Sequence, residues 1–152
     1  MRSLVTLPLT ASLLCGAMPL FADEAIKEAV EYRQGAMSVI GWNFKPMGAM
    51  IKGEKPYDQA AFAAMANDLA AAASLNLLAG YPEDSESDDS KVRPEVWMNW
   101  DDFKTKMSDF KQATSKLAKV AAGDDLGAIK KQFGNTAETC KACHKEYKAK
   151  KK

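Results

Sequence analysis

Histidine and cysteine are scarce in this chain of 152 residues, which contains one histidine and three cysteines. A single imidazole excludes chemistry that needs two, such as most histidine-rich metal sites. Three cysteines are too few for a disulfide scaffold. The charges nearly cancel, with 21 basic and 20 acidic side chains, so the chain has no general attraction to nucleic acid or to anionic lipid. Neither is expected as a partner.

Patterns of β-structure and of internal repeats are also missing. No stretch alternates apolar and polar residues between turns, as a half-buried strand does, and no repeat has a solenoid period. Hydrophobic residues make up 47% of the chain and charged residues 27%, which is typical of a globular domain. The sequence therefore favours one all-α domain.

The amino-terminal segment has the three-part pattern of a secretory signal peptide. Residues 1–3 are short and basic, residues 4–20 are mostly apolar without charge, and charged residues follow. We predict that residues 1–22 are cleaved after Ala22, with cleavage after Ala17 as the alternative. The apolar run is shorter than the ~20 residues of a usual span, which disfavours an uncleaved membrane helix. The mature protein is then periplasmic and carries no membrane anchor.

Apolar residues at steps of three and four predict helices throughout the mature domain, residues 23–152. Pro46 should kink or loosen the first helix, Asp58 should cap the second, and a break near Gly134 in the last stays open. Short connections between antiparallel helices predict an up-down-up-down four-helix bundle. The four expected helices cover residues 23–51, 58–78, 94–121 and 124–148.

The sequence CKACH, residues 140–144, has the pattern of covalent haem attachment in c-type cytochromes. On a helix, residues three apart lie on one face, so both thiols can add to the two vinyl groups on one side of a porphyrin. His144 lies one turn from Cys140, from where its imidazole can bind the iron axially. Cys15 falls in the predicted signal peptide. We therefore predict one covalent haem c, held by Cys140 and Cys143, with His144 as iron ligand.

Three other roles for this cysteine pair are weaker. A structural zinc site uses four ligands, whereas this chain offers three at most. A thioredoxin-type redox pair needs a strand–helix context, and the sequence shows no strand. A plain disulfide between Cys140 and Cys143 is the alternative for a chain that never receives haem.

The sequence contains no second histidine for the sixth coordination position of the iron. Only eight residues follow His144 and none is methionine, so a thioether ligand would come from upstream. Met37 lies in the apolar stripe of the first predicted helix and should face a haem held by the last; whether it bonds to the iron stays open. Core packing is the expected role of the other upstream methionines, Met47, Met50, Met65, Met98 and Met107.

Taken together, these features resemble the cytochrome c′ family, the class II c-type cytochromes. The resemblance covers the whole mature chain, and it depends on a haem motif near the carboxyl end combined with the segment that contains Arg33 and Gln34. It implies an antiparallel four-helix bundle with its haem on the last helix. The matching stretches are residues 32–37, 52–54, 56–58, 93–97, 133–134, 140–144 and 147–148.

The resemblance also implies roles for residues around the haem. Arg33 and Gln34 would approach the propionate edge, and Lys148 takes the basic position one turn after the proximal His144. Met37 takes the distal position, where members with five-coordinate iron carry a non-bonding apolar residue and a low-spin branch uses methionine as a ligand. Family members are often homodimers through their first two helices, and the alanine-rich second helix would allow that pairing.

Two functions follow for such a protein. The first is a one-electron carrier with a redox protein as partner, because a haem in a rigid bundle changes redox state with little rearrangement. The alternative is a five-coordinate haem protein that binds a diatomic gas, nitric oxide or carbon monoxide, as scavenger or sensor. The sequence offers no distal acid–base pair, so we expect no enzyme activity.

Overall fold

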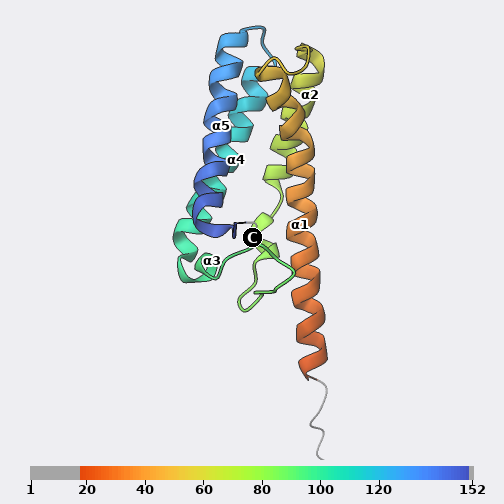
Figure 1. Cartoon of the computed structure of the whole chain (residues 1–152), viewed down its shortest axis with the longest axis vertical. Coiled ribbons are helices and arrows are strands. Elements are labelled where there is room, and N and C mark those ends of the chain that lie inside the picture. Colours follow the sequence, from red (N-terminus) through yellow and green to blue (C-terminus); the bar gives the residue numbers. More distant parts are fainter. Residues whose placement is uncertain (1–17, 151–152) are drawn as a thin grey trace, which may run out of the picture.

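Four long helices dominate the computed structural model, which describes residues 18–150. Two short helices lie in the connection between the second and third long ones, and the long helices run alternately up and down along one axis (Figure 1). The predicted all-α, antiparallel four-helix bundle is confirmed. In chain order the elements are α1 (Met18–Ile51), α2 (Gln59–Ser74), the 3₁₀ helix η1 (Leu77–Gly80), α3 (Glu95–Met98), α4 (Trp100–Ala121) and α5 (Leu126–Tyr147).

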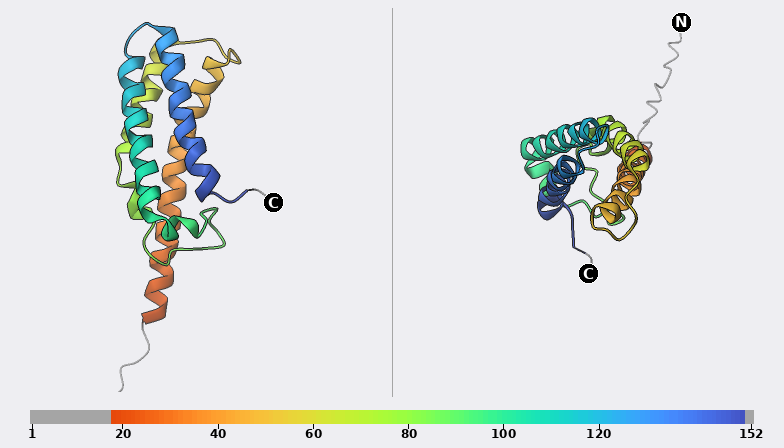
Figure 2. Two further views of the ribbon diagram at one scale, coloured as in Figure 1. Left: turned by 90° about the vertical axis from the view of Figure 1, so that its left-hand side faces the viewer. Right: turned by 90° about the horizontal axis from the view of Figure 1, so that it is seen from above.

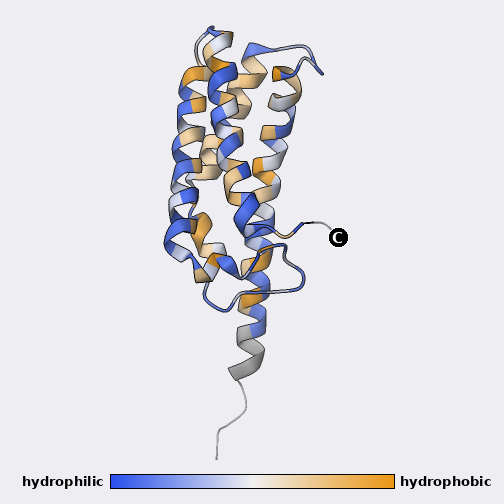
Figure 3. Cartoon of the chain, turned by 60° about the vertical axis from the view of Figure 1, so that its left-hand side comes forward, coloured by the Kyte–Doolittle hydropathy of each residue, from blue (hydrophilic) through white to orange (hydrophobic). Residues whose placement is uncertain are grey.

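The core lies between the long helices, which surround a common axis when viewed from the end (Figure 2). Because apolar residues recur every three or four positions, each helix has an apolar and a polar side (Figure 3). α2 packs against both α1 and α4, and α4 packs against α5. Small side chains on α2, such as the fully buried Ala66, let its neighbours approach closely. The largest fully buried apolar side chains are Phe62, Met47, Leu69, Leu117 and Ile129.

The third predicted helix is wrong in one respect, because the structure divides it into α3 and α4. Asn99 separates the two with a non-helical backbone (φ −123°, ψ 45°), and its side-chain amide donates to the carbonyl oxygen of Glu95 at 3.3 Å. Local side-chain bonds of this kind compete with the helix. The second predicted helix is too long: α2 ends at Ser74, and η1 takes the place of its last turn.

The other helix boundaries agree with the sequence, except that α1 begins at Met18 and not at residue 23. α1 continues through Pro46 and α5 through Gly134 without interruption. Asp58 and Asp125 cap α2 and α5, because the Oδ1 of each accepts the backbone N–H three residues further on, at 2.9 and 3.0 Å. Such caps satisfy an N–H group that has no partner within the helix.

The predicted signal peptide falls largely on residues 1–17, which lie outside the described residues, and α1 begins within its last part. Cleavage after Ala22 therefore stays a prediction. Within residues 18–150, no helix combines the length and the apolar character that crossing a membrane requires.

Candidate functional site

The predicted haem-attachment motif lies on the last turns of α5. Cys140, Cys143 and His144 all belong to this helix, so their spacing places them on one side of it. Both cysteines are half-buried free thiols, and His144 is more exposed. Cys140 packs against the main core, whereas Cys143 packs against a second cluster around Tyr81 and Phe103. The helix therefore presents two thiols and one imidazole along a single stripe.

Met37 lies opposite this motif on α1, as the register of the two helices indicates. Phe44 of α1 stacks on Phe133 of α5, with ring centroids 4.5 Å apart and an interplanar angle of 13°. α1 and α5 run in opposite directions (Figure 1). A residue a given number of positions before Phe44 on α1 therefore lies at the same height along the bundle as the residue that many positions after Phe133 on α5. Seven residues lead from Phe44 to Met37 and from Phe133 to Cys140, which is about two turns and about 10 Å. Met37 and Cys140 both pack against the main core.

Arg33 lies one further turn along α1, and only 3% of its surface is exposed. Its Nη1 donates to the carbonyl oxygen of Gly80 at 3.1 Å, and its Nη2 donates to that of Ser85 at 2.8 Å. Its guanidinium carbon lies 5.4 and 5.9 Å from the ring centroids of Tyr81 and Trp97, within the range of cation–π attraction. Burial lowers the pKa of Arg33. No carboxylate of the described residues pairs with this cation, and its Nε has no hydrogen-bond partner there.

These residues fit a haem. A haem offers vinyl groups to thiols, an iron to an imidazole, and propionate carboxylates to basic side chains. Cys140, Cys143 and His144 would take the first two, and a buried guanidinium with a free N–H is the donor that an anionic group would satisfy. When bound, the haem would supply an iron that exchanges one electron or takes a diatomic ligand.

Gln34 has a different position from its neighbour Arg33. Its side chain is exposed, and its Nε2 donates to the main-chain oxygen of Asp89 at 2.8 Å. The structure thus brings Arg33 to the level of the motif, whereas it joins Gln34 to the loop that borders this end of the bundle. Contact of either residue with haem propionates stays a prediction.

The pKa shifts of the two thiols and of the imidazole all favour the neutral forms of these groups. Burial raises the pKa of Cys140. Burial, and to a lesser extent the charge of the nearby Cys140, raises the pKa of Cys143 to about 11. Burial and the charge of Lys148 lower the pKa of His144. Reactive thiols of redox pairs have lowered pKa values, so this environment argues against a thioredoxin-type role. A neutral imidazole keeps the lone pair that an iron would bind.

An aromatic cluster beside Cys143 contains residues that the sequence did not single out. Tyr81 and Tyr147 pack edge to face on Phe103, with ring centroids 4.8 and 5.2 Å away. The Tyr147 hydroxyl donates to a carboxylate oxygen of Asp102, and burial together with this bond raises the pKa of Tyr147 to about 12. No sequence pattern indicated Asp102, because its partner Tyr147 lies on another helix.

Comparisons with known proteins agree with this geometry. A family model described as Cytochrome C′ matches residues 28–148. Cytochrome c′ of Halomonas halodenitrificans is 37% identical over 129 residues, which cover 81% of this chain and 97% of that protein. The solved structure of cytochrome c prime from Shewanella frigidimarina is 38% identical, with a TM-score of 0.80 over 82% of this chain and 97% of that one. A nitric oxide complex of a variant of cytochrome c prime from Alcaligenes xylosoxidans is 33% identical, with a TM-score of 0.75 over 83% and 97%.

Proposed function

The chain belongs to the cytochrome c′ family, and from this premise we propose that it is a periplasmic cytochrome that carries one haem and transfers single electrons. The family implies covalently bound c-type haem. The single copy of the attachment motif supports one haem per chain, and the predicted signal peptide supports the periplasm. The proposed activity is passage of an electron to or from a redox protein, without turnover of a substrate.

One observation carries the electron-transfer proposal: the Phe44–Phe133 stack sets a helix register in which Met37 is level with Cys140, and both residues pack against the same core. If His144 holds the iron of a bound haem, the Met37 thioether would be the side chain to supply a second protein ligand. An iron with two protein ligands keeps the same coordination in both oxidation states, so electron transfer requires little rearrangement. The stacked Phe44 and Phe133 rings, 4.5 Å apart, hold the two helices in this register.

Absorption spectra of the haem-loaded protein test this proposal. We expect low-spin iron in the oxidised and reduced forms and no rapid binding of carbon monoxide. Met37→Ala should convert the iron to high spin and open it to carbon monoxide, whereas Met65→Ala, a partly buried methionine of α2 packed on the same core, should leave the spectrum unchanged. An unchanged spectrum in Met37→Ala would exclude this residue as a ligand.

Binding of a diatomic gas is the second candidate function. Two solved structures of variants of the relative from Alcaligenes xylosoxidans are nitric oxide complexes. The surroundings of Met37 are apolar, because Ala36, Ile40 and Phe44 pack with it on the main core, and an apolar distal side would admit nitric oxide or carbon monoxide. High-spin ferrous iron that binds carbon monoxide rapidly in the wild-type protein would favour this function over electron transfer.

We also propose a homodimer through α1 and α2. A groove of about 660 Å³ runs along their outer side, and several large apolar side chains beside it reach the solvent. A second copy of the same face would cover these side chains, which a monomer leaves in water. They are Tyr32 (40% exposed), Val39 (51%), Trp42 (80%) and Leu75 (55%).

A further inference from the structure

Residues 81–93, here called the strap, connect η1 to α3 and join α1 to α5 at the end of the bundle that carries the haem motif. On the α1 side, Arg33 donates to the main-chain oxygen of Ser85 at 2.8 Å, and Gln34 donates to that of Asp89 at 2.8 Å. α1 and α5 otherwise meet further up the bundle, where Phe44 stacks on Phe133. The strap is therefore the second support that holds these helices in position.

Main-chain hydrogen bonds fix the other side of the strap to the end of α5. The backbone N–H of Arg93 donates to the carbonyl oxygen of Tyr147 at 3.0 Å, and the N–H of Ala149 donates to that of Lys91 at 2.9 Å. Between them, Val92 and Lys148 form an antiparallel bridge. Residues 147–149, at the end of α5 and just after it, are thus paired with residues 91–93 of the strap.

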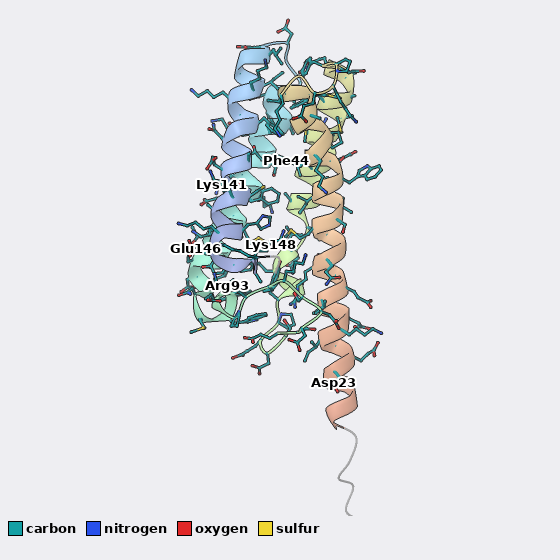
Figure 4. All side chains as sticks on the ribbon, in the orientation of Figure 1. Asp23, Phe44, Arg93, Lys141, Glu146 and Lys148 are labelled. Carbon is teal, nitrogen blue, oxygen red and sulfur yellow. The ribbon has the colours of Figure 1, made fainter. Side chains whose placement is uncertain are left out.

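The Arg93 side chain adds a charged contact to this pairing. Its Nη1 donates to the carbonyl oxygen of Glu146 at 2.8 Å, and its Nη2 pairs with the Glu95 carboxylate, which fixes the guanidinium. The last carbonyl groups of a helix have no partners within it, and a cation there is favourable. Figure 4 shows Arg93, Glu146 and Lys148 together at the lower end of α5. The turn that Arg93 holds begins at His144, whose carbonyl oxygen accepts from the N–H of Lys148 at 3.3 Å.

We propose that Arg93 is a positioning residue for the iron site: by fixing the last turn of α5 to the strap, it sets how His144 stands relative to α1 and Met37. This inference rests on the proposed haem function but not on whether the iron has five or six ligands. In either case a shift of the α5 end would move the imidazole that would hold the iron. Mutation of residues that orient a metal ligand from outside its coordination shell typically changes metal affinity or activity by about 10- to 100-fold.

Variants of the haem-loaded full chain test the proposal. In Arg93→Ala the rate of carbon monoxide association and the high-spin fraction should change, the rate by about tenfold, and the Ala149 amide should exchange faster with solvent. Arg93→Lys keeps one donor for the Glu146 carbonyl and should restore most of the wild-type behaviour. Lys91→Ala removes a charge from the strap but keeps its main-chain bonds, and should match the wild type.

A second control separates positioning from stability. Asp125→Ala removes the cap at the opposite end of α5, which costs about 1 kcal/mol, and should lower the unfolding temperature without changing the carbon monoxide rate or the spin state. Equal spectral changes in Asp125→Ala and Arg93→Ala would overturn the proposal, as would wild-type spectra and rates in Arg93→Ala. If Arg93→Ala does not fold, Arg93→Lys and Arg93→Gln decide the question by the same measurements. A colourless wild-type protein would instead refute the proposed function.

Discussion

Gly80 lies where the structure leaves no room for a side chain. A Cβ atom at this position would lie 2.9 Å from Cδ1 of Tyr32 and 3.0 Å from Cβ of Arg33. The Gly80 carbonyl oxygen accepts from Arg33, so the backbones of α1 and η1 approach each other closely here. Gly80→Ala should therefore destabilise the protein by about 1–3 kcal/mol, measured by urea unfolding of the haem-loaded chain.

Gly134→Ala is the matched control for that substitution. Nothing lies within 4 Å of a Cβ atom at this exposed position of α5, and alanine favours a helix over glycine by about 1 kcal/mol. This variant should be more stable than the wild type. A loss of stability in Gly134→Ala, or none in Gly80→Ala, would contradict the packing described here.

The two cysteines of the motif give a second prediction at this scale. If both hold the haem through thioether bonds, replacing Cys140 and Cys143 together by serine should make the pigment extractable by acid–acetone. In the wild type the haem should stay with the polypeptide, as measured by the haem absorption of the acid–acetone extract and of the precipitated protein. Haem that remained attached in the double variant would refute the thioether assignment.

At the residue scale, the sequence predicted site residues that belong to a local motif. It did not predict residues whose role depends on contacts far apart in the chain. Cys140, Cys143 and His144 follow from a spacing within one helix. Arg93 does not, because it acts on a carbonyl oxygen 53 positions away in the chain. Main-chain acceptors are the same for every residue type, so such a pairing leaves no trace in composition or periodicity.

At the scale of elements, α1 is the exception among the long helices because it contains Pro46. Proline supplies no N–H to the carbonyl four residues back and costs about 3 kcal/mol relative to alanine inside a helix. Pro46→Ala should therefore raise the unfolding temperature of the haem-loaded protein. Pro56→Ala, in the exposed turn between α1 and α2, should lower it slightly because the unfolded chain gains freedom. Changes of the same sign in both variants would contradict this explanation.

Periodicity predicted the long helices well because each has one buried side that extends over many turns. It was less successful between α2 and α4. The predicted second helix became α2 followed by η1, and the third was divided at Asn99. Hydrogen bonds from short polar side chains to nearby backbone groups determine where such helices end. The spacing of apolar residues does not predict these hydrogen bonds.

At the scale of the whole molecule, the exposed apolar face of α1 and α2 leads to a prediction about assembly. Trp42→Ser removes the most exposed large apolar side chain of that face, with 80% of its surface in water, and should shift a dimer toward the monomer in sedimentation velocity. Met98→Ser is the control, since Met98 is 78% exposed on α3, outside the groove. A wild-type protein that is monomeric at high concentration would refute the dimer.

The neighbours of α1 have a consequence for the order of assembly. α2, α4 and α5 form a continuous row of packed helices, whereas α1 joins that row through α2 and η1 and touches α5 through one aromatic stack and the strap. Before α1 docks, the side of α5 that carries Cys140 and Cys143 would therefore be accessible to a haem. We expect α1, the long helix that is synthesised first, to be the last of the four to dock.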